Sequence, residues 1–172
     1  MITNVTENAE AVAAGLAMPH IITDPFWNWF IVFGGAGATF GLTLLMMGSK
    51  SSHLRSIGKL GFIPSIFNIK EPILFGAPIV MNPILFIPLI VAPMVSATLG
   101  YMLISTGLIP NFFMMTSWTV PAPIGAMWSS GWHLSPMFAV FAMIAITTVI
   151  WYPFFKLYER QLLAQEKEST NE

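Results

Sequence analysis

The sequence predicts an all-α integral membrane protein with about three spanning helices, two re-entrant hairpins and a short amphipathic helix. Two observations support this prediction. Only 9% of the 172 residues are charged, whereas a soluble domain carries about 25%. Residues 26–48 and residues 72–155 contain no Asp, Glu, Lys or Arg. A helix needs about 20 mainly apolar residues to cross a bilayer, so both runs are long enough to hold spanning helices.

Composition narrows the possible partners and cofactors. The net charge is −1, and no basic-aromatic pattern is present, so we expect no nucleic-acid partner. The absence of cysteine excludes disulfides, thiolate chemistry and cysteine-based metal sites. His53 has no partner at a metal-ligand spacing, and the glycine run of residues 35–41 lacks the spacing of a dinucleotide-binding motif. We therefore expect neither a metal nor a cofactor.

The first quarter of the chain contains a polar segment and then an apolar one. Residues 1–25 are polar to mildly amphipathic, which predicts an external loop with a short helix over residues 7–16. Residues 26–48 form the first predicted span. Trp27 and Trp29 stand at its start, where an aromatic belt meets the membrane surface.

The first predicted span is rich in glycine. Its small-residue patch includes Gly37 and Gly41 at GxxxG spacing. Close helix–helix packing is the favoured interpretation. Glycine also lets a backbone approach a ligand closely, which keeps Gly37 a candidate binding residue.

The first polar break in the membrane region, residues 49–60, is basic. It contains Lys50, His53, Arg55 and Lys59 but no acidic residue. By the positive-inside rule this link is cytoplasmic. A topology signal is the favoured interpretation, and docking of an acidic or phosphorylated partner is the alternative.

Residues 61–82 are apolar but repeatedly interrupted by polar, charged, Pro and Gly residues. No piece between interruptions approaches the about 20 residues of a span, so the segment predicts a re-entrant hairpin. Interrupted segments of this kind point to a transporter's binding site. An ionisable group at the bilayer centre costs roughly 2.5–3.5 kcal/mol by insertion scales. Glu71 is therefore the leading candidate for a functional residue, while the neighbouring Lys70 has no assigned role.

The rest of the membrane region, which covers residues 26–155 as a whole, repeats these two patterns. Residues 83–108 and residues 135–155 are the second and third predicted spans. Residues 110–132 lie between them and are broken by Pro, Gly and Trp residues, which predicts a second re-entrant hairpin. Residues 156–172 form a polar tail, and its basic residues place the C-terminus in the cytoplasm.

Several separated motifs resemble one known family. The segments 68–76 (NIKEPILFG) and 77–83 (APIVMNP) look like the signature region of the lactose/cellobiose-type enzyme IIC. This protein is the membrane permease of the bacterial phosphoenolpyruvate-dependent sugar phosphotransferase system. The segments 34–41, 56–61 and 152–156 fit the same family, and the resemblance covers nearly all of residues 20–165.

The resemblance implies a set of site residues. In this family the glutamate of the first hairpin hydrogen-bonds the sugar near the hydroxyl group that is phosphorylated, and Glu71 matches it, with Asn68 alongside. Glu71 is thus the candidate catalytic residue. The second hairpin contributes an aromatic ring and backbone contacts, for which Trp118 and Pro121 are the matching residues.

The resemblance also implies partners and a location. The expected substrate is a disaccharide, and a separate phosphorylated IIB protein donates a phosphoryl group to it from a cysteine. Because this transfer requires the IIB protein, it stays open whether the chain itself counts as an enzyme. The expected location is the bacterial plasma membrane, with several crossings. Family members are more than twice this length, so the chain resembles the C-terminal portion of a permease that lacks its N-terminal half and forms a homodimer when complete. Two alternatives remain: a porter or channel component without phosphoryl transfer, and a fragment that does not transport.

Overall fold

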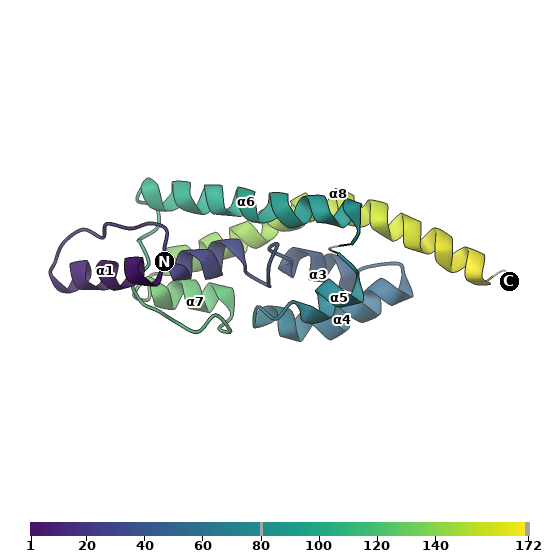
Figure 1. Cartoon of the computed structure of the whole chain (residues 1–172), viewed down its shortest axis with the longest axis horizontal. Coiled ribbons are helices and arrows are strands. Elements are labelled where there is room, and N and C mark those ends of the chain that lie inside the picture. The colour runs from purple at the N-terminus through teal and green to yellow at the C-terminus, as the bar shows by residue number, and fades with distance from the viewer. Residues whose placement is uncertain (80, 171–172) are drawn as a thin grey trace.

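The computed structural model describes residues 1–79 and 81–170, and helices are its only regular elements there. The predicted all-α class is confirmed. Figure 1 shows an elongated molecule in which two long helices run lengthwise beside several shorter ones. In chain order the elements are α1 (Ile2–Ala13), α2 (Asp24–Phe26), the π-helix η1 (Trp27–Ile31), α3 (Phe40–Met47), α4 (Ser52–Ile66), α5 (Glu71–Gly76), α6 (Pro83–Ser105), α7 (Ala122–Ser129) and α8 (Leu134–Thr170).

Helices α6 and α8 are the two helices of the described chain that are long and apolar enough to cross a membrane. In sequence, α6 corresponds to the predicted span 83–108, and α8 includes the predicted span 135–155. Only 28% and 33% of their most apolar windows are buried inside the molecule, so most of the residues in these windows are at least partly exposed. Exposed apolar surface of this extent is unusual for a soluble monomer and suits contact with lipid.

The segment 26–48, predicted as one span, is interrupted. It contains the last residue of α2, then η1, a turn over residues 32–39, and α3. Gly34, Gly35 and Gly37 adopt φ of 69°, 107° and 89°, values that glycine reaches without the clash of a Cβ atom. The sequence expectation of a continuous helix therefore differs from the structure at the glycine-rich run, which forms a turn.

The two segments predicted as re-entrant hairpins each contain a polar or irregular stretch beside a short helix. In the first, α4 runs through the basic link and ends at Ile66, and α5 then packs back against α4. In the second, residues 106–121 form an extended loop that leads into α7. Whether either segment enters and leaves the membrane on one side stays a prediction.

Large aromatic side chains fill the centre of the molecule. Trp29, Phe30 and Trp151 are completely buried. The indole Nε1 of Trp29 donates to Ser129 Oγ at 3.0 Å, which joins η1 to α7. A Cβ atom on Gly100 of α6 would lie 2.8 Å from the Phe30 ring, so glycine allows α6 to pack closely on η1.

The short segment between α3 and α4 is fixed to α8. Glu159 is buried, and its Oε1 accepts hydrogen bonds from Ser49 Oγ at 2.6 Å and from the Lys50 backbone N–H at 2.7 Å. Its Oε2 accepts from Lys156 Nζ at 2.7 Å. Ser51 Oγ donates to Glu166 at 2.6 Å. Residues 156–166, predicted as part of a polar tail, are thus a packed continuation of α8.

Helix α1 is anchored through Asn8, which is fully buried. Its side-chain nitrogen donates to the carbonyls of His20 at 2.7 Å and Phe112 at 2.9 Å. His20 also pairs with Glu7 through its ring. The helix begins five residues before the predicted range of 7–16 and belongs to the folded unit.

Candidate functional site

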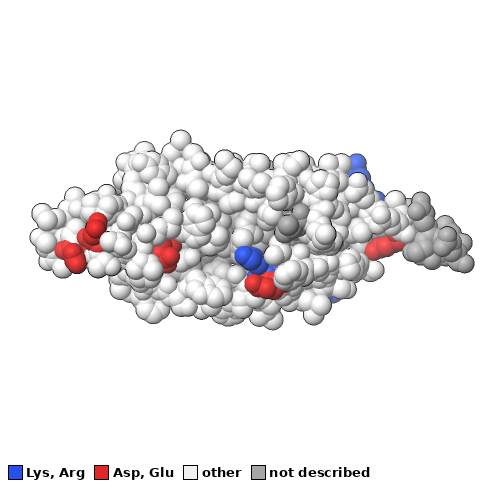
Figure 2. All heavy atoms as spheres, viewed as in Figure 1, with Lys and Arg blue, Asp and Glu red and all other residues white. Residues whose placement is uncertain are grey.

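A polar pocket of about 240 Å³ lies where three distant segments meet. These segments are η1 with the glycine turn, the connection between α4 and α5, and the loop before α7. Most of the face in Figure 2 is uncharged, but a basic and an acidic patch lie side by side near its middle. The residues that line the pocket are Asn28, Val32, Gly35, Ala36, Asn68, Lys70, Glu71 and Trp118.

Asn68 joins the three segments. It occupies the left-handed region at φ 61°, which asparagine tolerates better than most residues. Its Oδ1 accepts from the Gly34 backbone N–H at 2.8 Å. Its Nδ2 donates to the carbonyls of Trp118 at 2.6 Å and Val120 at 3.1 Å. Because an amide nitrogen has two hydrogens, both of its donors are used by the protein itself.

Glu71 is the first residue of α5 and is exposed to the pocket. Among the residues that the structure describes, its carboxylate forms no hydrogen bond or ion pair. An ionised carboxylate offers about four acceptor positions. Glu71 is therefore available to accept hydrogen bonds from the hydroxyl groups of a ligand.

Trp118 supplies an aromatic surface at the same pocket. Trp118 is 56% exposed, and its backbone carbonyl accepts a hydrogen bond from the Asn68 side chain. Aromatic faces suit the apolar C–H face of a sugar ring, and a few polar groups then fix its orientation. The pocket thus combines an available carboxylate with a wide aromatic surface.

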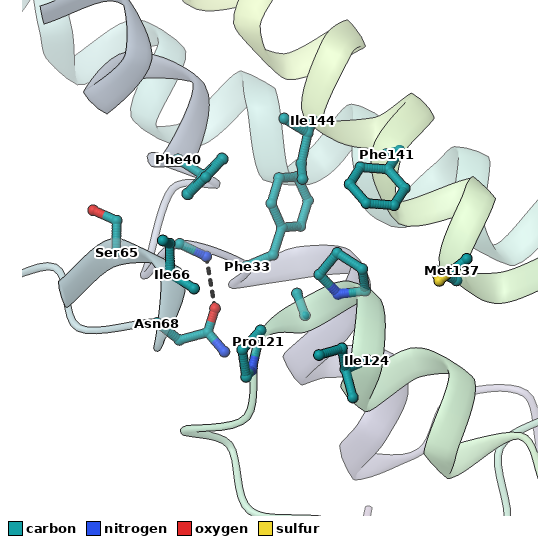
Figure 3. Close-up of a pocket in the computed structure, with 13 residues that line it drawn as sticks. Phe33, Phe40, Ser65, Ile66, Asn68, Pro121, Ile124, Met137, Phe141 and Ile144 are labelled. Carbon is teal, nitrogen blue, oxygen red and sulfur yellow. Dashed lines mark hydrogen bonds between the residues drawn. The ribbon is translucent and has the colours of Figure 1, made fainter. Parts of the chain in front are cut away.

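Two of the predicted site residues lie elsewhere. Pro121 lines a neighbouring apolar pocket of about 270 Å³, shown in Figure 3, where Asn68 forms part of the wall. Gly37 lines neither of these pockets. Its carbonyl accepts from the Trp151 indole at 3.2 Å, and a Cβ atom there would lie 2.3 Å from Leu89 Cδ1. This geometry supports helix packing, the favoured interpretation of the glycine patch, rather than ligand contact at Gly37.

Five lining residues had no predicted role: Asn28, Val32, Gly35, Ala36 and Lys70. Asn28 donates through its side-chain nitrogen to Asp24 at 2.9 Å, which leaves its side-chain oxygen as a possible acceptor. Gly35 and Lys70 contact each other, and Ala36 follows in the turn. In the sequence, Asn28 is a polar side chain inside an aromatic run, and this pattern could have marked it as a candidate site residue. Nothing in the sequence indicates that Gly35 meets Lys70.

Comparison with known proteins identifies the family. The family described as "Phosphotransferase system, EIIC" matches residues 1–93, more than half of the chain. The chain belongs to the phosphotransferase system EIIC family. The resemblance seen in the sequence is thereby confirmed, and EIIC components are integral membrane proteins.

Individual EIIC relatives match nearly the whole chain. The lactose-specific EIICB component of Streptococcus mutans is 38% identical over 167 residues, which cover 96% of this chain and 29% of that protein. The lichenan permease IIC component of Bacillus subtilis is 38% identical over 163 residues, 94% of this chain and 36% of that protein. The chain spans roughly a third of the length of these relatives.

A solved EIIC structure has the same fold. The crystal structure of the transporter ChbC, the IIC component of the N,N'-diacetylchitobiose-specific phosphotransferase system, matches with a TM-score of 0.93 and 36% sequence identity. The match covers 96% of this chain and 39% of that one. The helical arrangement described above, with its interruptions, is therefore an EIIC arrangement.

Proposed function

We propose that this chain is the sugar-binding half of a phosphotransferase-system permease. It binds a disaccharide in a membrane cavity, moves it across the membrane and presents it for phosphorylation by a cytoplasmic IIB protein. The observation that carries the proposal is the meeting of Asn68, Glu71 and Trp118 at one polar pocket. The names of the relatives, which specify lactose, lichenan and oligo-beta-mannoside, support a saccharide as the substrate.

Glu71 has the central role in this proposal. Its carboxylate accepts a hydrogen bond from the sugar hydroxyl that is to be phosphorylated and takes the proton as that oxygen attacks phosphorus. Positioning supplies most of the catalysis in phosphoryl transfer, and a placed base adds to it. The absence of protein partners for this carboxylate among the described residues supports the assignment.

Trp118 and Asn68 have different roles. The exposed ring of Trp118 packs against one face of the sugar. Asn68 uses both amide hydrogens on backbone carbonyls, so it positions the pocket walls and donates no hydrogen bond to the ligand. The resemblance implied that Asn68 is a substrate-binding residue, and the proposal gives it this positioning role within the same pocket.

The proposed membrane placement puts the Ser49–Ser51 segment and the C-terminal part of α8 on the cytoplasmic side. Lys50 lies in the first segment, and Lys156 and Arg160 directly follow the uncharged part of α8, which is where the positive-inside rule expects cytoplasmic residues. The hydrogen bonds from Ser49 to Glu159 and from Ser51 to Glu166 support a shared side, since they hold these segments together. The IIB partner is supported by relatives named EIICB, which combine both components. The N-terminal half of the permease and a homodimeric assembly complete the proposal.

Titration calorimetry on the chain in lipid nanodiscs tests the proposal. Cellobiose, lactose and N,N'-diacetylchitobiose serve as ligands. Glu71→Gln should weaken binding about tenfold or more, as expected for the loss of a hydrogen bond to a charged group. Glu10→Gln is the matched control, because Glu10 is exposed on α1 away from the pocket.

Other outcomes would contradict the proposal in different ways. Equal binding by the two variants would remove Glu71 from the site. No binding of any disaccharide by the unaltered chain would favour a fragment that does not transport. Uptake that continues in cells without the phosphoryl donor protein would favour a porter or channel component.

A further inference from the structure

Lys70 is a cation at the pocket without an ionic or hydrogen-bonding partner in the described part of the chain. It is half-buried and lines the same wall as Glu71. Among the described residues its ammonium group forms no ion pair or hydrogen bond, either with Glu71 or with any other residue.

The stem of Lys70 is held in place by Gly35. A Cβ atom on Gly35 would lie 2.3 Å from Lys70 Cβ, 3.1 Å from Cγ and 3.0 Å from Cδ. The glycine turn therefore leaves room for the lysine chain, which lies directly on the Gly35 backbone. Fixing this stem limits the volume in which the ammonium group moves.

A neutral disaccharide does not explain a fixed cation at its site. Partial burial of an ammonium group weakens its hydration, and this cost is recovered only when an anion arrives. Lysine is a compact point charge that suits phosphate. The reaction of the proposed function brings one such anion, the phosphoryl group, to the sugar beside Glu71.

We propose that Lys70 binds the phosphoryl group during its transfer to the sugar and then the phosphate of the product. This inference rests on the proposed function. The sugar hydroxyl oxygen forms a bond to phosphorus as the bond from phosphorus to the partner's cysteine sulfur breaks. The hydroxyl proton passes to the Glu71 carboxylate, and the cysteine leaves as a thiolate. Lys70 stays protonated throughout and offsets the charge of the group in transit.

Binding of a neutral and a phosphorylated ligand to the same variants tests this role. The probes are cellobiose and cellobiose 6′-phosphate, titrated calorimetrically into the chain in lipid nanodiscs. Lys70→Met should keep the affinity for cellobiose within about twofold and weaken cellobiose 6′-phosphate about tenfold or more. Lys70→Arg should restore much of the phosphate preference. Lys59→Met, on an exposed position of α4, should leave both affinities unchanged.

The dependence of ligand affinity on ionic strength gives a second test on the same samples. The affinity of the unaltered chain for cellobiose 6′-phosphate should fall as ionic strength rises, because salt screens charge interactions. This dependence should be smaller in Lys70→Met. If Lys70→Met does not fold, Lys70→Gln provides the same comparison with a polar side chain.

The outcomes separate this inference from the proposed function. If the unaltered chain binds cellobiose and Lys70→Met weakens both ligands equally, Lys70 has a structural role and the inference is wrong. Unchanged affinity for both ligands in Lys70→Met would overturn it as well. If the unaltered chain binds neither ligand, the proposed function fails and the inference fails with it.

Discussion

The side-chain amide of Asn68 donates to the backbone carbonyl of Trp118 at 2.6 Å, across 50 positions of sequence. The same amide also contacts Val120 and Gly34. One side chain thus sets the distance between the turn that presents Glu71 and the loop that presents Trp118. The geometry of the pocket therefore depends on a residue that has no amide hydrogen left for a ligand.

Asn68→Asp should reduce both stability and sugar binding. The substitution removes both donor hydrogens and places one carboxylate oxygen against the carbonyls of Trp118 and Val120. An unsatisfied buried polar group costs about 1–3 kcal/mol, and separation of the loops should weaken binding further. Asn111→Asp is the matched control, because Asn111 also donates to two carbonyls, of Met18 and His20, outside the pocket. Thermal unfolding measures the stability of the two variants, and calorimetry measures their sugar affinity. Equal losses of sugar affinity in Asn68→Asp and Asn111→Asp would contradict the positioning role of Asn68.

Gly35→Ala should destabilise the protein and disturb the pocket. The added Cβ atom would meet Lys70 Cβ at 2.3 Å, and φ at this position is 107°. Gly107→Ala isolates the backbone contribution, since Gly107 has φ 75° but no atom within 4 Å of an added Cβ. A backbone conformation that disfavours side chains costs about 1–3 kcal/mol. Gly35→Ala should lower the apparent Tm more than Gly107→Ala does. An equal decrease in Tm would show that Lys70 moves aside without a loss of stability.

Trp118→Ala should weaken disaccharide binding, while Trp118→Phe should retain part of the affinity. The expected loss reflects the aromatic surface offered to the sugar, and about tenfold corresponds to 1.4 kcal/mol. Trp132→Ala serves as the control. Trp132 is similarly exposed, at 59% against 56%, but stacks on Trp128 outside the pocket. Quenching of tryptophan fluorescence by added sugar offers an independent measurement, and it should disappear in Trp118→Ala alone.

Glu159→Gln should destabilise the junction between α8 and the Ser49–Ser51 segment. The substitution removes the charge that binds Lys156 and leaves an amide nitrogen facing donors. Hydrogen bonds to charged groups contribute about 1.5–3 kcal/mol, so thermal unfolding should occur at a lower temperature. Glu10→Gln, on an exposed site, should leave the transition unchanged. Similar unfolding of both variants would mean that Glu159 contributes little to the fold.

The sequence predicts the class of this fold well because composition carries the information. The scarcity of charge and the long apolar runs indicate membrane helices, and α6 and α8 lie where two spans are expected. The interruptions around Asn68 and Glu71 also locate the turn between α4 and α5. These features depend on residues close together in the chain, so a local pattern reveals them.

The glycine turn shows where local patterns fail. An uncharged run with small residues fits both a packed helix and a turn with positive φ. The choice depends on partners far away: Asn68 for Gly34, Lys70 for Gly35, and Leu89 for Gly37. A single sequence contains these residues but does not indicate which of them meet.

Glu159 was missed for the same reason. It stands in a run of mixed charges that resembles a solvated helix surface. Its partner Ser49 lies 110 positions away, so the sequence gives no sign that the carboxylate is buried. Lys70 is comparable: its contact with Gly35 follows from the tertiary fold, not from its place beside Glu71.

The continuity of α8 has a consequence for how the protein stands in the membrane. At 1.5 Å per residue its 37 residues extend about 56 Å, well beyond a hydrocarbon core of about 30 Å. The uncharged part, residues 134–155, accounts for about 33 Å and matches that thickness. The remaining residues continue the helix for about 22 Å, and hydrogen bonds to Glu159 and Glu166 attach the Ser49–Ser51 segment to this part of α8. A protein that approaches this end of the molecule would therefore meet a helix that extends about 22 Å beyond the uncharged segment.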